Sequence, residues 1–336
     1  MARSDLPDAS IDSEPQALTT EEQLLLSELA RHAVGARVEV AGSKVLKRQV
    51  DYLVLLVNMR HPTLRVTVKL AGPLAALPCP FERTAALLRR VLAETTVPVP
   101  EVLAADTSYR AWPWRYMVKT YMPGREWATV RRRLREEESA RVHREMGRAV
   151  AQLHGMAFQG FGELSDDGTL QTGRPYLDAL AERARRRIHD PRHAELFISV
   201  LKDKAGLFRD VSPGQAGLCH EDLHGHNIIC QRRDGSWRLA AVLDFDSAWA
   251  GHQESDLARL EFWRGMAGEG FWEAYKEVRP IAETYPQRRL IHQLMWCLEY
   301  GPSSEEHIED TRRVCAALGV APPGGFAWPT NSALFG

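Results

Sequence analysis

The side chains best suited to chemistry in this 336-residue chain gather in two short polar segments, each of which follows an apolar run. The first segment contains Asp222 and Asn227, and the second contains Asp244 and Asp246. A carboxylate can orient a hydroxyl group, while an amide oxygen and further carboxylates form the all-oxygen shell that Mg²⁺ prefers, completed by nucleotide phosphates. If the two segments meet in space, these residues predict a site for phosphoryl transfer.

The elements around the two segments predict that they do meet. Apolar runs flank the first segment on both sides, and a third run leads into the second segment. Between them, residues 233–236 (Arg-Asp-Gly-Ser) predict a tight hairpin turn, because Asp-Gly readily adopts the positive φ angles that such a turn requires. The hairpin folds its second strand back along the first and so brings the second polar segment beside the first.

The spacing His220-x-Asp222-x-x-x-x-Asn227, followed by Asp244-Phe245-Asp246, resembles the catalytic and metal motifs of the protein-kinase-like superfamily. It is similar in particular to the aminoglycoside phosphotransferase (antibiotic kinase) family. That family often has Gly where Glu221 stands in this chain. Further matches to the family lie at residues 97–102, 153–154, 161–162, 251 and 256–258.

The resemblance implies an α+β, two-lobed protein-kinase-like fold. A smaller N-terminal lobe with an antiparallel sheet binds the nucleotide, and a larger, mainly helical C-terminal lobe carries the catalytic loop, the metal motif and the acceptor-substrate site. We expect these lobes at residues 18–122 and 123–336. Residues 1–17 lack hydrophobic periodicity and predict a flexible tail. Leucines and alanines at helical spacing then predict a helix at 20–33.

The resemblance also implies roles for the residues of the two polar segments. Asp222 orients the acceptor hydroxyl and accepts its proton. Asn227 and Asp244 hold Mg²⁺. Asp246 either binds a second metal ion or braces the loop.

On the nucleotide side, Lys69 ends a predicted strand and is implied to contact the phosphates. Its partner is expected to be Glu82, on the predicted helix that follows. The family's glutamate position falls on Thr84 instead, and two positions correspond to a rotation of about 200° on a helix. A Lys69–Glu82 pair therefore depends on where that helix starts.

Two further parts of the nucleotide site are expected from the first lobe. Backbone groups around Lys119 and Tyr121 are implied to bind the base of ATP or GTP. Gly42 and Ser43 lie in a predicted turn, where backbone N–H groups could approach phosphate or could simply close a hairpin.

The composition of the chain indicates which cellular compartment and which binding partners to expect. The chain has 43 basic and 44 acidic residues, so neither a nucleic acid nor an anionic membrane surface is an expected partner. No apolar run is long enough to cross a membrane. The N-terminus has no secretory signal, and five scattered cysteines favour free thiols in a reducing cytoplasm. The oligomeric state is left open.

We therefore predict a Mg²⁺-dependent phosphotransferase that moves the γ-phosphoryl group of ATP or GTP to a hydroxyl of an antibiotic such as an aminoglycoside. The alternatives are a metabolite kinase acting on an amino alcohol or sugar, and a non-catalytic nucleotide-binding pseudokinase. A zinc hydrolase is disfavoured, because no C-x-x-C pattern is present and because residues 220–224 (His-Glu-Asp-Leu-His), which fit H-E-x-x-H, fall in a predicted loop and not on the helix that the zinc motif requires. Residues 247–336 contain 12 acidic and 8 basic residues, an excess of four acids (12 − 8) that favours a cationic or polyhydroxyl acceptor.

Overall fold

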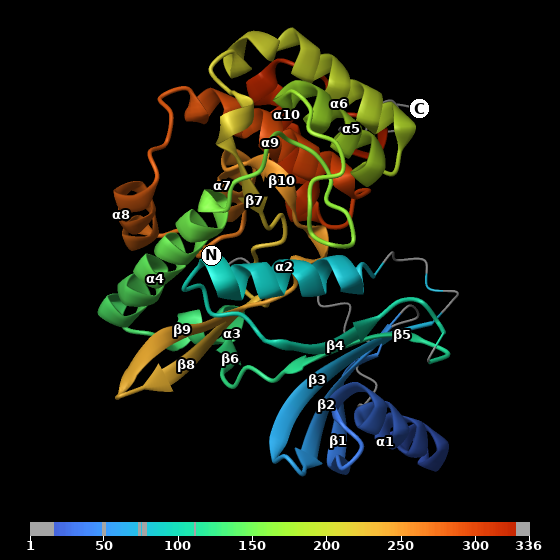
Figure 1. The fold of residues 1–336 in the computed structure, drawn as a ribbon. Helices are drawn as coiled ribbons and strands as arrows, with labels where there is room; N and C mark the ends of the chain where they lie inside the picture. Colours follow the sequence, from blue (N-terminus) through green and yellow to red (C-terminus); the bar gives the residue numbers. More distant parts are fainter. Residues whose placement is uncertain (1–16, 49–51, 73–74, 76–78, 111, 327–336) are drawn as a thin grey trace, which may run out of the picture.

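The structure, a computed structural model, describes residues 17–48, 52–72, 75, 79–110 and 112–326. The predicted tail at 1–17 therefore lies outside the described residues, apart from residue 17. Within the described ranges, an antiparallel sheet with two helices forms the N-terminal third, and helices dominate the rest (Figure 1). The predicted α+β fold class is confirmed.

The N-terminal sheet has five antiparallel strands in the order β1-β2-β3-β5-β4. One face packs against helix α1 (Thr20–Val34), which confirms the predicted helix at 20–33. Buried Leu29 of this helix belongs to the same core as Leu55 and Val57 of the sheet. The strands are β1 (Glu39–Arg48), β2 (Tyr52–Arg60), β3 (Leu64–Ala71), β4 (Val102–Asp106) and β5 (Arg115–Thr120).

The predicted turn at Gly42 and Ser43 is wrong. Both residues lie inside β1, where Gly42 pairs with Asn58 and Ser43 pairs with Val57 of β2. A register shift just before Gly42 accommodates the glycine, and an antiparallel strand can continue through such a bulge. The two residues therefore do not form the phosphate-binding turn that the sequence suggested. The connection between β1 and β2 falls at residues 49–51, outside the described residues.

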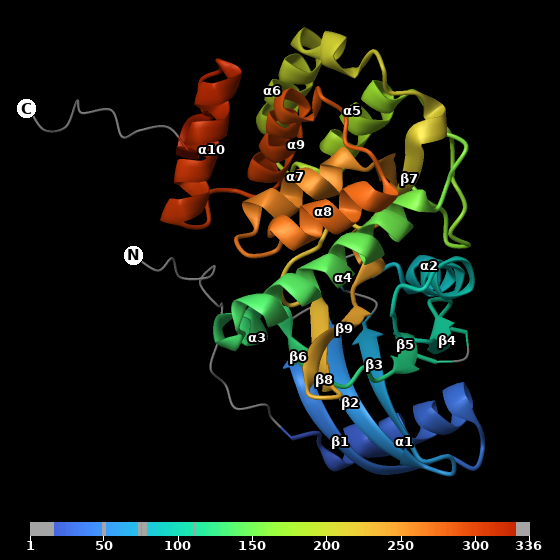
Figure 2. The same ribbon diagram turned by 90° about the vertical axis from the view of Figure 1, so that its left-hand side faces the viewer.

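Helix α2 (Phe81–Glu94) lies between the N-terminal sheet and the C-terminal helices (Figures 1 and 2). Its buried side chains Phe81, Ala85 and Leu88 belong to the large hydrophobic core that the C-terminal helices build. The apolar residues recur at helical spacing, so one face of α2 is buried while the polar side chains between them face elsewhere. Helix α2 is therefore anchored to the C-terminal core although it precedes two strands of the N-terminal sheet.

Two small sheets carry the polar segments. Strand β7 leads into the loop with Asp222, and β9 leads into Asp244. Asp234 and Gly235 have φ angles of 50° and 75°, so the predicted hairpin turn at 233–236 is confirmed. The sheets consist of β7 (Ala216–Cys219) with β10 (Trp249–His252), and of β6 (Arg125–Glu126), β8 (Ile228–Arg233) and β9 (Ser236–Val242).

Most of the C-terminal helices lie around the β7–β10 sheet, whereas the β6–β8–β9 sheet lies on the other side of α4, beside the N-terminal sheet (Figure 2). Helix α4 therefore runs along the junction between the two parts of the molecule. In the described residues, none of the helices is both long enough and apolar enough to span a membrane. The α-helices of this part are α3 (Trp127–Val130), α4 (Glu136–Gly155), α5 (Tyr176–Arg187), α6 (Pro191–Asp203), α7 (Glu254–Phe262), α8 (Glu269–Val278), α9 (Tyr285–Glu299) and α10 (Glu305–Leu318).

Candidate active site

The loop between β7 and β8 is anchored by a buried carboxylate. Asp256, in the first turn of α7, accepts hydrogen bonds from the backbone N–H groups of His220 and Glu221, both at 2.7 Å. His154 Nε2 lies 3.0 Å from Asp256 Oδ2, and His220 Nε2 lies 2.8 Å from the carbonyl oxygen of Leu243. Buried polar groups require such partners. The start of the loop is therefore fixed to α7, to α4 and to the end of the hairpin.

Asp222 and Asn227 meet inside this loop. The Asn227 amide nitrogen donates to Asp222 Oδ2 at 3.0 Å and to the Asp222 carbonyl oxygen at 2.9 Å. Burial raises the pKa of Asp222, but neighbouring His224, together with the charges of His220 and Arg259, outweighs burial and lowers it to about 2. Asp222 is thus an anion at neutral pH. The amide oxygen of Asn227 remains directed away from it.

Asp244 occupies a left-handed backbone conformation, with φ of 63° and ψ of 71°, immediately after the hairpin. Burial and the neighbouring Asp246 raise the pKa of Asp244, although Lys69 and Lys119 oppose this. Its carboxylate accepts no hydrogen bond from the described residues. A divalent cation would supply the missing positive charge. The Leu243 N–H donates to the Asn227 carbonyl oxygen at 2.8 Å, so the backbones of the two polar segments adjoin, and carboxylate and amide oxygens are donor types that fit Mg²⁺.

Asp246 joins the two parts of the molecule. Its carboxylate accepts from Lys69 Nζ at 2.7 Å and from the Thr84 hydroxyl at 2.7 Å, while its carbonyl oxygen accepts from Arg83 at 2.6 Å. Burial lowers the pKa of Lys69, but the charge of Asp246 outweighs burial and raises it. Burial raises the pKa of Asp246, and Lys69 and Thr84 outweigh this and lower it. Both groups are therefore ionised at neutral pH.

The predicted Lys69–Glu82 pair is not formed. The Glu82 carboxylate instead accepts a hydrogen bond from the backbone N–H of Thr107 at 3.3 Å, after β4. Helix α2 begins at Phe81, so Glu82 and Thr84 point about 200° apart around its axis. Thr84, the position at which the sequence comparison placed the family's glutamate, donates instead to Asp246, the carboxylate that Lys69 also contacts. The match of Thr84 to the family's glutamate position already indicated this, but Glu82 was expected as the partner of Lys69 because it is the residue with a negative charge.

Lys119 enters the site through its side chain, which the sequence reasoning missed. Lys119 pairs with Thr67 across β5 and β3, and alternate residues of a strand share a face, so Lys119 lies on the same face of the sheet as Lys69. Burial lowers the pKa of Lys119, and the charges of Asp244 and Asp246 oppose this. A second lysine therefore contributes to the electrostatics of the metal motif.

Tyr121 follows Lys119 at the end of the sheet. Its backbone N–H donates to the Arg65 carbonyl oxygen at 2.9 Å, and the Arg65 guanidinium lies 4.3 Å from the centroid of the Tyr121 ring. The predicted use of backbone groups here for a nucleotide base therefore cannot rely on the Tyr121 N–H in this arrangement.

Glu221 explains the departure from the family's glycine. It has φ of 65°, a conformation that glycine adopts easily, yet its side chain is only 3% exposed. Trp249 Nε1 donates to it at 3.2 Å, and Arg259 and Arg183 lie 3.5 and 3.8 Å away. Burial raises the pKa of Glu221, but the two arginines outweigh burial and lower it to about 2. The glutamate is a buried anchor beneath Asp222.

The described residues give little support to the zinc alternative. The cluster of possible ligands found among them is His154, Cys219 and Asp256, all buried. Asp256 already accepts hydrogen bonds from the loop, and His154 Nδ1 lies 2.8 Å from the Tyr275 hydroxyl. Burial raises the pKa of the Cys219 thiol, which disfavours the thiolate that binds zinc. This cluster is a hydrogen-bonded support for the loop.

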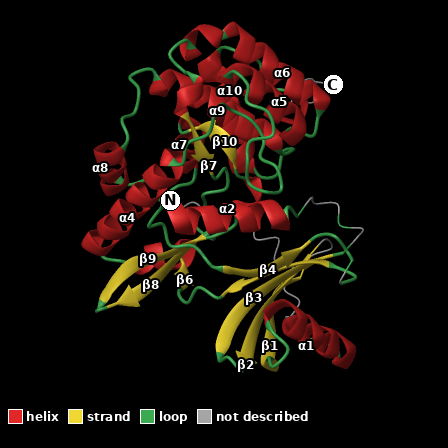
Figure 3. Ribbon diagram, viewed as in Figure 1, coloured by secondary structure: helices red, strands yellow, loops and turns green. Residues whose placement is uncertain are grey.

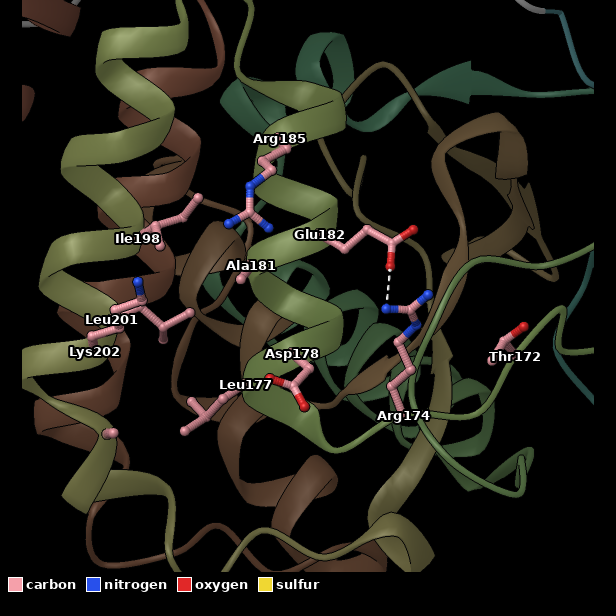
Figure 4. A pocket seen from close by; sticks show the side chains of 11 residues that line it. Thr172, Arg174, Leu177, Asp178, Ala181, Glu182, Arg185, Ile198, Leu201 and Lys202 are labelled. Atoms are coloured by element: carbon pink, nitrogen blue, oxygen red, sulfur yellow. Dashed lines mark ion pairs between the residues drawn. The ribbon is translucent and has the colours of Figure 1, made fainter.

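A groove of about 810 Å³ lies between α5 and α6 and includes none of the predicted site residues (Figure 4). Its lining includes Asp178, Glu182 and Arg185 of α5, and Glu182 pairs with Arg174 on the side of α5 away from α6. Arg183 lies on the opposite side of α5, where it contacts Glu221. The groove is therefore separate from the candidate active site, although it is large.

A family comparison agrees with this geometry. A model described as "Phosphotransferase enzyme family" matches residues 49–291, which is more than half of the chain. The chain belongs to this family. Figure 3 shows the mixed architecture of this chain, with helices in red and strands in yellow.

Solved structures with the same fold include several phosphotransferases. Aminoglycoside phosphotransferase APH(4)-Ia is 17% identical, with a TM-score of 0.62, and the match covers 88% of this chain and 97% of that one. A mutant of that protein, solved in complex with ADP and hygromycin B, is 16% identical with a TM-score of 0.61, over 87% and 97% of the two chains. A microcompartment-associated aminopropanol kinase is 14% identical with a TM-score of 0.52, over 88% and 95%. At these identities the likeness is one of fold.

Proposed function

We propose that this protein transfers the γ-phosphoryl group of ATP or GTP to a hydroxyl group of a small molecule, with Mg²⁺ as cofactor. The observation that carries the proposal is the hydrogen bond of 3.0 Å between Asn227 and Asp222. It couples the carboxylate expected to receive the acceptor hydroxyl to the amide expected to bind the metal ion. Phosphoryl transfer needs these two functions side by side, because the attacking oxygen must meet the γ-phosphorus in line with the leaving group.

In the proposed reaction, the acceptor oxygen forms a bond to the γ-phosphorus while the bond from that phosphorus to the β–γ bridging oxygen breaks. The electron pair of the broken bond stays on the nucleoside diphosphate, and the hydroxyl proton passes to the Asp222 carboxylate. A pKa of about 2 makes Asp222 a weak base. Its main contribution is therefore to orient the hydroxyl, and it accepts the proton late, as a loose transition state permits.

The charges around the phosphates are divided among several residues. Asn227 and Asp244 would hold Mg²⁺, which when bound neutralises charge on the phosphate oxygens. Lys69 would contact the phosphates while Asp246 keeps it oriented, and we assign Asp246 this bracing role in preference to a second metal site. Lys119 adds a further cation to the same face of the sheet.

For the acceptor we retain an antibiotic such as an aminoglycoside as the leading proposal and an amino alcohol or sugar as the alternative. The presence of Lys69, Asp222, Asn227 and Asp244 together argues against a non-catalytic pseudokinase. We also propose a cytoplasmic location, since all five cysteines are free and buried, as a reducing compartment allows.

Titration calorimetry with ATP, with and without Mg²⁺, tests the proposal. Two ligands such as Asn227 and Asp244 are too few to hold Mg²⁺ without phosphate oxygens, so metal and nucleotide should strengthen each other's binding. Asp244→Ala should weaken binding of Mg²⁺–ATP by roughly 5–150-fold, the usual range of a coupling free energy, while metal-free ATP is affected less. Asp203→Ala, at the exposed end of α6, is the control. Nucleotide binding that ignores Mg²⁺ would contradict the proposal.

A further inference from the structure

Two lysines share the face of the N-terminal sheet that is turned away from α1. Lys69 pairs with Met117 across β3 and β5, and two positions along the same strands Thr67 pairs with Lys119. The two lysines are therefore diagonal neighbours, which lie about 7–8 Å apart on an antiparallel pair. Val118, the residue between Met117 and Lys119, belongs to the core beneath α1. Since successive side chains of a strand alternate between faces, Lys119 points the other way, toward α2 and the metal motif.

The two ammonium groups differ in their partners. Lys69 Nζ lies 2.7 Å from Asp246 Oδ2, and this ion pair carries no net charge. Within the described residues, the Lys119 ammonium has neither a hydrogen-bond acceptor nor a carboxylate in ion-pair contact. Its strand lies between β3 and β4, so the half-buried side chain cannot turn out to solvent at a sheet edge. An ammonium held in such a place without a partner is costly, and a bound anion would remove that cost.

The surroundings of Lys119 indicate which anion fits. The acids whose charges act on Lys119 are Asp244 and Asp246. Asp246 is already paired with Lys69, whereas the Asp244 carboxylate accepts no hydrogen bond from the part of the chain that the structure describes. The site thus contains one carboxylate without a cation and one ammonium without an anion. A nucleotide phosphate chain that carries Mg²⁺ supplies both missing charges together.

We infer that the Lys119 side chain is a second phosphate-binding group of the nucleotide site, and that it donates to the phosphate chain even when no metal ion is bound. This inference rests on the proposed phosphotransferase function and adds a residue to it, since only backbone groups were expected to act at this segment. An ammonium group donates three hydrogen bonds and accepts none, and its hydrogen bonds to phosphate oxygens are charge-assisted. Lys119 is the lysine of the pair whose charge is not already balanced in the free protein.

Calorimetry with ATP in the presence of EDTA, on the full chain, measures this contact without metal. Lys119→Met keeps the length of the side chain but removes its charge, and it should weaken ATP binding by about tenfold or more, as expected for the loss of one charge-assisted hydrogen bond. Lys119→Arg keeps a cation and should recover most of the lost affinity. Lys276→Met removes an exposed lysine of α8, matches the change in net charge, and should bind ATP as wild type does.

Adenosine separates a phosphate contact from a base contact. Saturation-transfer NMR measures its binding, and Lys119→Met should leave that binding unchanged because adenosine carries no phosphate. Lys119→Gln repeats the test with a polar, uncharged side chain and should weaken ATP as Lys119→Met does.

Three results would overturn the inference. The first is metal-free ATP binding by Lys119→Met and Lys119→Gln that equals that of wild type. The second is a Lys119→Arg variant as weak as Lys119→Met, and the third is a loss of adenosine binding as large as the loss of ATP binding. Wild-type ATP binding that does not respond to Mg²⁺ would instead refute the proposed function.

Discussion

The two halves of the candidate site are held in different ways. The Asp222 loop is supported from within the C-terminal part by groups that are almost fully buried: the Asp256 side chain is 0% exposed, and that of His154 is 1% exposed. The Lys69–Asp246 pair crosses between the N-terminal sheet and the C-terminal part, and its side chains are 14% and 21% exposed. The first arrangement resists change because breaking it leaves buried polar groups unpaired.

We infer from this difference that the Asp222 loop serves to position the acceptor, whereas the Lys69–Asp246 pair responds to ligand binding. Buried, fully bonded groups hold the acceptor-orienting carboxylate in one geometry whether or not substrate is present. The Lys69–Asp246 pair can exchange partners when phosphate and metal arrive, because both ends remain accessible to ligand. We therefore expect changes at the loop to reduce stability as well as catalysis, and changes at the pair to act on catalysis alone.

The largest effect is expected for Asp222→Asn. An amide cannot accept the hydroxyl proton, and catalysis by a positioned base is typically worth about 10²–10⁴-fold. The value of kcat should fall by that factor, while calorimetry shows nucleotide binding close to wild type. Asp234→Asn is the matched control, since asparagine tolerates the positive φ of that turn. A folded Asp222→Asn protein with kcat within tenfold of wild type would remove Asp222 from the proposed role.

Asp256→Asn should come next and should change stability. An asparagine oxygen can accept only part of what the carboxylate accepts from His220 and Glu221, so a buried N–H is left unsatisfied. The cost is about 1–3 kcal/mol in the free energy of unfolding. Urea denaturation measures it, and exposed Asp203→Asn should stay within about 0.5 kcal/mol. An unchanged midpoint for Asp256→Asn would mean that the loop does not depend on this anchor.

A double-mutant cycle between Lys69→Met and Asp246→Asn examines the other half. Groups in contact couple by about 0.5–3 kcal/mol, and we expect such a coupling in kcat/KM with little change in unfolding free energy. A parallel cycle between Lys69→Met and Glu82→Gln should give zero coupling, because Glu82 bonds Thr107 instead. Coupling to Glu82 and none to Asp246 would reverse the correction made above.

The smallest effects are expected for the single variants Thr84→Val and Glu82→Gln. Thr84→Val removes the hydroxyl that donates to Asp246, which is worth about 0.5–1.5 kcal/mol for one hydrogen bond, and should lower kcat/KM severalfold. Glu82→Gln keeps an oxygen that can accept from Thr107, so kcat/KM should stay within twofold of wild type. Steady-state kinetics at saturating Mg²⁺ measure kcat/KM for both variants. If Glu82→Gln lowers kcat/KM more than Thr84→Val does, Thr84 has no part in holding Asp246.

The sequence by itself was enough for what depends on local spacing. The turn at Asp234–Gly235 follows from the φ preferences of those two residues, and the meeting of the Asp222 and Asp244 segments follows from the hairpin that the turn closes. The helix at 20–33 followed from its periodicity. Gly42 shows the limit of such reasoning, because a bulge just before it lets β1 continue through the glycine while it stays paired with β2.

Only the tertiary structure decided the partners of the charged groups. Lys69 and Asp246 lie 177 positions apart, and Glu221 finds its arginines on α5 and α7. No local pattern carries this information, because an ion pair depends on how helix α2 is rotated against the sheet and how the helices pack behind the loop. Charge alone favoured Glu82 as the partner of Lys69. The rotation of α2 about its axis points Thr84, and not Glu82, toward the site, because side chains two positions apart on a helix face nearly opposite directions. Asp246 is the carboxylate that pairs with Lys69.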